Sequence, residues 1–196
     1  MSVVLRMGLR TGEQKLIVIM GAVAATEALR RFGVAAQIKW PNDVVVGSTG
    51  RGPLRVKKLG GLLVERVSVG DGADAHVLGL GLNVNQAEEE LPPGAAVRAT
   101  SMRVEQGRRF DRNEVCRAVL EELNAWYRRL AMGQPERILA RWRRLSCLLG
   151  RVVRVRVEGR ELGGRAIGIR STGELIFRDE TGRDLLLRDG TAQLLL

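Results

Sequence analysis

The chain has 196 residues, 45% of them hydrophobic and 28% charged, with a mean hydropathy of −0.05. This suits one compact domain or one domain with a small appendage, and it excludes a disordered chain and a membrane protein. The net charge of +10 fits a nucleic acid, an acidic protein or a phosphate-bearing ligand as partner. Three tryptophans, one tyrosine and three phenylalanines are too few for the stacking platform typical of single-strand binders.

Targeting segments, disulfides and histidine-based metal sites are also excluded. The longest apolar run, residues 16–26, is too short to cross a bilayer and lies in the wrong place for a signal peptide. The two cysteines show no metal-ligand spacing, so a reducing compartment, the cytoplasm, is expected. The single histidine, His76, excludes a multi-histidine metal site.

The first half of the chain predicts strands around one helix. A strand is expected over residues 2–10, and a helix over 14–32 that ends at Gly33. Short extended segments are expected at 38–40 and 43–46, followed by a Gly-rich loop at 47–53. Apolar, β-branched runs at 59–69 and 77–84 predict two buried neighbouring strands. Residues 86–110 look irregular.

The second half predicts two helices and a small β unit. Asp111 and Glu114 form a capping-box signature for a helix that ends at Gly133. Pro135 begins a second helix that ends near Gly150. Beyond it, apolar and charged residues alternate between closely spaced turns, the first of them at Glu158-Gly159, which predicts about five antiparallel strands in a barrel-like unit. We expect a domain boundary near residues 147–151.

Residues 39–43 form the first segment whose side chains could make up a functional site. In Lys39-Trp40-Pro41-Asn42-Asp43, the proline favours an extended Trp40. A cation, an indole, an amide and a carboxylate are thereby displayed at the end of one strand and the start of the next. These groups suit a nucleotide site, although a surface turn with a tryptophan anchor is the other interpretation.

A second segment places Lys58 directly before Gly60 and Gly61, at the start of an apolar strand. Glycines there let a ligand approach the backbone, and the lysine is a point charge for a phosphate or carboxylate. Alternatively, the glycines only accommodate a bulge. Lys57 is expected to be solvated.

A third segment is a glycine-thinned strand. Gly79 and Gly81 lie two residues apart and so point to the same sheet face, which Asn83 continues. They form a flat floor for a planar or extended ligand. A core strand that merely contains glycines is the alternative, and the dinucleotide fingerprint is absent because no helix follows at the required spacing.

The order and spacing of these segments resemble the catalytic region of biotin protein ligases, the enzymes that attach biotin to a carrier-protein lysine. The matching motifs are KWPND at 39–43, KxGGxLxE at 58–65, GxGxN at 79–83, Ala99-Thr100-Ser101, the Asp111-Arg112 helix start and the Arg141-Trp142 helix. The resemblance implies an α+β fold. Residues 1–148 would form a mixed sheet flanked by helices, like class II aminoacyl-tRNA synthetases, and residues 151–196 a small SH3-like β barrel.

The family also has a Gly/Arg-rich loop of GRGRxxR type that binds biotin and phosphate, and some members carry a helix-turn-helix before it. Neither pattern occurs in this sequence. We therefore expect an N-terminally truncated catalytic domain, without a DNA-binding domain, that does not form biotinyl-adenylate at an appreciable rate on its own.

The resemblance implies that biotin and ATP, with Mg²⁺ on the nucleotide, form biotinyl-5′-AMP and that a carrier lysine then takes the biotin. It implies these site residues: Lys58 and Asp43 as catalytic, Lys58, Gly60 and Gly61 as biotin-binding, and Lys39, Trp40, Asn42 and Asn83 as nucleotide-binding, with no protein metal site. The partner it implies is the biotin carboxyl carrier protein, the biotin-accepting domain of acetyl-CoA carboxylase. A homodimer is left open.

Two other functions are weighed against the ligase. One is a non-catalytic, truncated homologue that binds a nucleotide or a protein. The other is a basic domain that binds nucleic acid through the C-terminal barrel, for which a steep salt dependence of DNA binding would be diagnostic. The remaining candidate groups suggest little chemistry: His76 is expected in a loop or at a strand edge, and Cys116 and Cys147 as inert core thiols.

Overall fold

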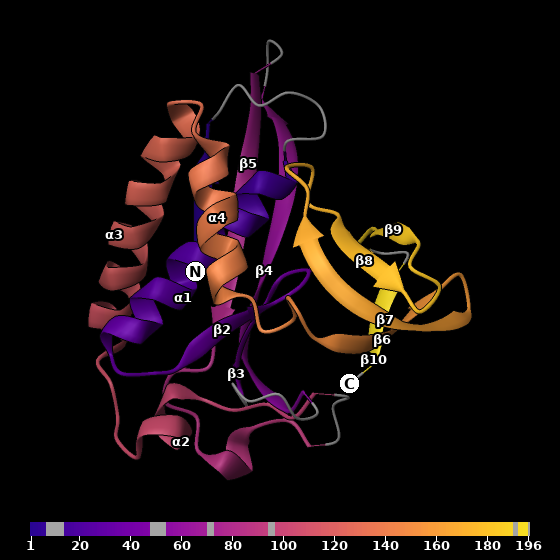
Figure 1. The fold of residues 1–196 in the computed structure, drawn as a ribbon. Helices are drawn as coiled ribbons and strands as arrows, with labels where there is room; N and C mark the ends of the chain where they lie inside the picture. The colour runs from indigo at the N-terminus through magenta and orange to yellow at the C-terminus, as the bar shows by residue number, and fades with distance from the viewer. Residues whose placement is uncertain (7–13, 48–53, 70–72, 94–96, 190–191, 196) are drawn as a thin grey trace.

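The computed structural model describes residues 1–6, 14–47, 54–69, 73–93, 97–189 and 192–195 (Figure 1). They form two five-stranded antiparallel sheets and four α-helices. The first sheet has the spatial order β1-β5-β4-β3-β2, with β1 (Ser2–Leu5), β2 (Ala36–Lys39), β3 (Asp43–Gly47), β4 (Val56–Val69) and β5 (Ala73–Leu82).

The expected mixed sheet is wrong for the described strands, because all four pairings in the first sheet are antiparallel. Among the residues that the structure describes, parallel contacts occur only as isolated bridges, Ile38 with Ser146 and Lys58 with Ala99. The strand expected over residues 2–10 ends at Leu5, and its last four positions lie outside the described residues. Positions 48–53 of the expected Gly-rich loop also lie outside them.

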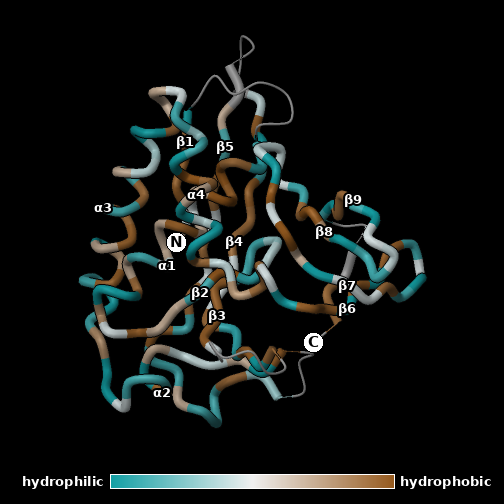
Figure 2. Tube along the Cα trace, in the orientation of Figure 1, coloured by the Kyte–Doolittle hydropathy of each residue, from teal (hydrophilic) through white to brown (hydrophobic). Residues whose placement is uncertain are grey.

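One face of this sheet is covered by helix α1 (Lys15–Arg31), which is apolar and buried along most of its length because it lies between the sheet and two further helices (Figures 1 and 2). At Gly21, an added Cβ would lie 2.7 Å from Leu62 Cδ2 and 3.1 Å from Leu78 Cδ2. Glycine therefore lets α1 pack closely on β4 and β5. Gly33, with φ of +84°, ends the helix as expected.

Helices α3 (Arg112–Ala131) and α4 (Pro135–Leu145) form the outer layer. The Asp111 side chain accepts a hydrogen bond from the Asn113 N–H at 2.7 Å, so the expected N-cap is confirmed. Glu27 of α1 ties the layers together by accepting from Trp126 Nε1 at 2.6 Å and from Arg141 Nε at 2.5 Å. Within 86–110, expected to be irregular, lie a 3₁₀ turn (Glu88–Glu90) and α2 (Met102–Gln106).

The second sheet has the order β10-β6-β7-β8-β9, with β6 (Val152–Val157), β7 (Arg160–Ile169), β8 (Leu175–Asp179), β9 (Asp184–Leu187) and β10 (Ala192–Leu195). The predicted alternation is present, since Val153 and Val155 are buried while Arg154 and Arg156 are exposed. Barrel closure, the SH3-like assignment and the domain boundary remain predictions. No helix of the described chain is long and apolar enough to cross a membrane.

The β4–β5 hairpin leaves one face of the first sheet open. The two strands are neighbours as predicted, with Leu63 opposite Gly79. They are buried only on the helix side, however, because Leu63 and Val67 on the other face are 61% and 44% exposed. The expectation that both strands are buried is therefore wrong for this face, which is free to receive a ligand.

Candidate active site

A lysine–aspartate pair lies where β3 begins beside β4. Lys58 Nζ is 2.5 Å from Asp43 Oδ1. The β3–β4 register shifts between Val44 and Val45, whose partners on β4 skip Leu59. Leu59 is thus the extra residue of a β-bulge, which turns Lys58 toward the sheet face that carries Asp43.

The Asp43 carboxylate lies between two ammonium groups, since Lys39 Nζ is 3.5 Å from its Oδ2. The side chains of Lys39 and Asp43 are only 11% and 12% exposed, whereas that of Lys58 is 43% exposed. Asp43 therefore compensates a buried cation and holds an accessible one. Three of the four lysines in this arginine-rich chain, Lys39, Lys57 and Lys58, lie in this region.

Glycines form an open shelf beside the pair. Gly61 is opposite Asp43 on one side and Gly81 on the other. An added Cβ at Gly61 would lie 3.4 Å from both Asp43 Oδ1 and Lys58 Nζ, whereas one at Gly81 would meet nothing within 4 Å. A Cβ at Gly60 would instead collide with the Gly81 carbonyl oxygen. Gly60 therefore brings the strands together, and Gly61 and Gly81 leave backbone open to a ligand.

Asn42 and Trp40 hold the turn between β2 and β3. Asn42 Nδ2 donates to the Leu62 carbonyl at 2.7 Å, and the Leu62 N–H donates to the Asn42 carbonyl at 3.0 Å. Trp40 is 2% exposed, and its indole N–H donates to the Gly173 carbonyl at 3.0 Å. The indole is therefore an anchor, and the exposed stacking surface expected from the sequence is not present.

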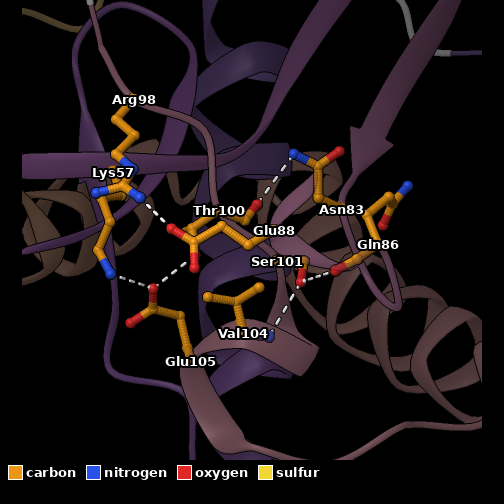
Figure 3. A network of polar contacts seen from close by, with 9 residues as sticks. All are labelled: Lys57, Asn83, Gln86, Glu88, Arg98, Thr100, Ser101, Val104 and Glu105. Carbon is orange, nitrogen blue, oxygen red and sulfur yellow. Dashed lines mark hydrogen bonds and ion pairs between the residues drawn. The ribbon is translucent and has the colours of Figure 1, made fainter. Parts of the chain in front are cut away.

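Asn83 lies at the end of β5 beside the segment 98–101 (Figure 3). Its Nδ2 donates to the Thr100 carbonyl at 3.0 Å. The same segment brackets the Lys58 backbone: the Lys58 N–H donates to the Arg98 carbonyl, and the Thr100 N–H donates to the Lys58 carbonyl, both at 2.8 Å. Segment 98–101 thus holds the backbone of Lys58 in place.

Lys57 was expected to be solvated, and its side chain is 41% exposed, but it also forms an ion pair that was not expected. Its Nζ is 2.6 Å from Glu105 Oε1, which also accepts from Thr100 Oγ1 at 2.6 Å (Figure 3). Sequence reasoning missed Glu105. The sequence signal for the short helix that carries Glu105 was Ser101, a typical N-cap residue followed by good helix formers. In the structure the Ser101 Oγ caps α2 by accepting from the Val104 N–H at 3.1 Å.

The remaining candidates lie outside this site. His76 is inside β5 and 2% exposed, and neither ring nitrogen has a hydrogen-bond partner among the described residues, so the loop or edge position is wrong. Cys147 is buried, and burial raises the pKa of its thiol to about 11. Cys116 is only partly buried. In the described parts of the chain, no three His, Cys, Asp or Glu side chains are grouped to hold a metal.

The chain is similar to known ligases of the biotin and lipoate type. Residues 1–85 match the Biotin/lipoate A/B protein ligase family. The biotin–[acetyl-CoA-carboxylase] ligase of Mycobacterium tuberculosis is 34% identical over 78% of this chain and 51% of its own length. The bifunctional ligase/repressor BirA of Bacillus spizizenii is 27% identical over 93% of this chain and 54% of its own.

A solved structure of a biotin protein ligase variant from Aquifex aeolicus, in complex with biotin, superposes with a TM-score of 0.77 at 25% identity. The match covers 98% of this chain and 76% of that one. Together these similarities support membership of the biotin protein ligase family. It spans about half the length of the curated relatives it matches.

Proposed function

We propose that this chain carries the catalytic centre of a biotin–protein ligase, which forms biotinyl-5′-AMP from biotin and ATP and transfers biotin to a carrier lysine. The observation that carries this proposal is Lys58, an accessible ammonium held by Asp43 beside the open shelf of Gly61 and Gly81. A matched structure of the Aquifex enzyme contains both biotin and ATP, which supports the same two substrates here.

The glycine shelf and Lys58 would bind different parts of the substrates. Biotin would lie against the open face, with Gly60 and Gly61 shaping the backbone beneath it and its carboxylate at Lys58. Lys39, Asn42 and Asn83 would border the nucleotide. Trp40 would contribute by holding this border, since its ring is buried.

In the first step, an oxygen of the biotin carboxylate attacks the α-phosphorus of ATP. A new oxygen–phosphorus bond forms while the bond from the α-phosphorus to the pyrophosphate oxygen breaks. Both reacting groups are anionic, so the Lys58 ammonium lowers their repulsion and stabilises the charge on the phosphoryl oxygens. Loss of such a fixed group typically costs about 3 kcal/mol of transition-state stabilisation.

In the second step, the neutral amine of the carrier lysine attacks the acyl carbon of the mixed anhydride. The new amide bond forms, the bond to AMP breaks, and the proton released by the amine nitrogen passes to solvent or to the leaving phosphate. Asp43 would orient the incoming amine once Lys58 has moved to the leaving phosphate, because its Oδ1 is the oxygen that Lys58 occupies at rest.

The described residues do not fit a protein-held Mg²⁺. Both carboxylate oxygens of Asp43 face lysine ammonium groups, and no further acidic group clusters with it in the described chain. Mg²⁺ would accompany the polyphosphate of ATP as part of that substrate, and no step is derived through it.

The finer assignments follow from the same proposal. The acceptor would be the biotin carboxyl carrier protein, and the second sheet, as an SH3-like unit over residues 151–196, would help position it or the nucleotide. The reaction would take place in the cytoplasm, and self-association into a homodimer is one arrangement open to test.

Titration calorimetry tests the site without requiring turnover. The ligand is a non-hydrolysable analogue of biotinyl-5′-AMP, and the variants are Lys58→Met and, as a control, Arg154→Met, which removes an exposed cation of β6. We expect Lys58→Met to weaken binding at least about tenfold, the equivalent of 1.4 kcal/mol, and Arg154→Met to leave it unchanged. Equal affinities for all three proteins would refute the assignment.

Biotin-dependent exchange of labelled pyrophosphate into ATP tests the chemistry itself. Exchange that disappears in Lys58→Met supports the ligase. Tight analogue binding without any exchange would instead favour a non-catalytic nucleotide-binding homologue.

A further inference from the structure

The two sheets are joined at the candidate site through one buried side chain. Trp40 follows β2, and its indole N–H donates to the carbonyl of Gly173, a residue of the turn between β7 and β8. The two residues are 133 positions apart in the chain. The bond therefore links the site-bearing turn of the first sheet to a fixed point on the second.

The turn that accepts this bond is itself held in place. Gly173 has φ of +89°, and an added Cβ would lie 2.7 Å from the Lys15 Cβ at the start of α1. Lys15 Nζ also pairs with Asp189 Oδ2 of the C-terminal unit at 3.1 Å. On the other side of Trp40, the Cys147 N–H donates to the Ile38 carbonyl at 2.9 Å.

Trp40 lies within the loop that the Lys39–Asp43 ion pair closes. Lys39 precedes it directly and Asp43 follows three residues later, and their side chains are among the least exposed charged groups in the described chain. Any displacement of the indole must move both partners of that pair. Asn42 fixes the far end of the turn on β4.

We propose that Trp40 is a positioning residue through which the second sheet holds the Asp43 carboxylate, and with it Lys58, in register with the shelf. This role rests on the proposed ligase function for its catalytic meaning, but the coupling itself is a property of the fold. Through this bond the C-terminal unit would act on the site without touching the Lys58–Asp43 pair.

Acetylation of Lys39 in the folded protein measures the coupling without relying on turnover. The chain is treated with dilute acetic anhydride, and Lys39 modification is quantified by mass spectrometry against Lys57 as internal reference. In Trp40→Phe an aromatic ring still fills most of the site, but the Gly173 carbonyl loses its hydrogen-bond donor. Local opening of the turn, and with it the labelling of Lys39, should therefore rise about tenfold.

Trp142→Phe is a matched control. Trp142 is also fully buried, but its indole nitrogen has no hydrogen-bond partner among the described residues, so the same substitution removes ring volume without removing an inter-sheet bond. A rise in Lys39 labelling in Trp40→Phe alone supports the proposal. No rise, or an equal rise in both variants, overturns it.

A second variant perturbs the acceptor of this hydrogen bond, the Gly173 carbonyl. Gly173→Ala strains the turn and should raise Lys39 labelling as Trp40→Phe does. If either variant fails to fold, hydrogen exchange of the Trp40 indole proton in the unsubstituted chain decides. Protection close to that of the protein's core amides supports the coupling, and exchange as fast as in an exposed indole overturns it.

The catalytic meaning is tested separately by pyrophosphate exchange. Trp40→Phe should lower the maximal exchange rate more than the apparent affinity for ATP, because it misplaces Asp43 and Lys58 without removing a ligand contact. Absence of exchange in the unsubstituted chain would refute the ligase function and leave the labelling result to judge the coupling.

Discussion

Gly60 and Gly81 lie on the neighbouring strands β4 and β5, one residue out of register, yet alanine at the two positions should have opposite consequences. At Gly60 the new methyl group would collide with the Gly81 carbonyl oxygen and lie 2.7 Å from Leu82 Cδ2. At Gly81 it would meet nothing within 4 Å and would project over the open shelf.

The structure gives the size of each effect. Because the obstruction at Gly60 includes backbone, the strands must move apart, and overpacking of this kind costs about 1–3 kcal/mol. Gly81 has no positive φ, so alanine there restricts the unfolded chain and stabilises the fold by about 0.4–1 kcal/mol. The same methyl group occupies the surface on which we place the ligand, so binding should weaken about tenfold, or 1.4 kcal/mol.

Urea unfolding and titration with the biotinyl-5′-AMP analogue measure the two quantities. Gly60→Ala should lower the unfolding free energy, whereas Gly81→Ala should preserve it and lose affinity. If Gly81→Ala binds the analogue as the unsubstituted chain does, the shelf is not the binding surface. If the two variants are equally destabilised, the reasoning from the added Cβ atoms is wrong.

Three further predictions concern the lysines, the second sheet and the cysteines. Lys58→Ala should lower pyrophosphate exchange by about two orders of magnitude, whereas Lys57→Ala should mainly lower the melting temperature by freeing Glu105; equal losses of exchange would contradict both roles. Removing residues 151–196 should lower the melting temperature, since it leaves the Trp40 indole N–H unpaired, and the isolated fragment should not bind duplex DNA at submicromolar concentration in physiological salt. At pH 8 a thiol-specific reagent should label Cys116 faster than Cys147, whose raised pKa leaves only about one thiol in a thousand ionised; comparable rates by mass spectrometry would refute the burial argument.

The elements that the sequence predicted well are those with local causes. The Asp111 cap, the Pro135 helix start and the turn at Glu158 and Gly159 each depend on residues adjacent in the chain. At that turn φ is +49° and +80°, which agrees with the hairpin expected there. The two strands that carry the glycine motifs also lie close to their predicted positions, because strand alternation is a short-range pattern.

The features that escaped prediction depend on distant partners. Lys57 and Lys58 are adjacent and chemically identical, and only the bulge at Leu59 and the arrival of Glu105 separate their surroundings. Whether Trp40 is exposed or buried depends on the Gly173 turn. His76 lies inside the sheet because β5 is between β1 and β4, a strand order that no local pattern reveals, and it shares the buried face of β5 with Leu78 and Leu80.

The charge arrangement around Asp43 has a consequence for selectivity. Before any substrate arrives, the two neighbouring ammonium groups already share the Asp43 carboxylate, so one of their two positive charges is compensated and the site attracts anions less strongly than two free lysines would. A stray phosphate or chloride ion would have to displace an internal partner and would receive little in return. A substrate that also contacts the apolar face, as we propose for biotin, would gain enough binding free energy to displace Asp43 from Lys58. A small anion would not.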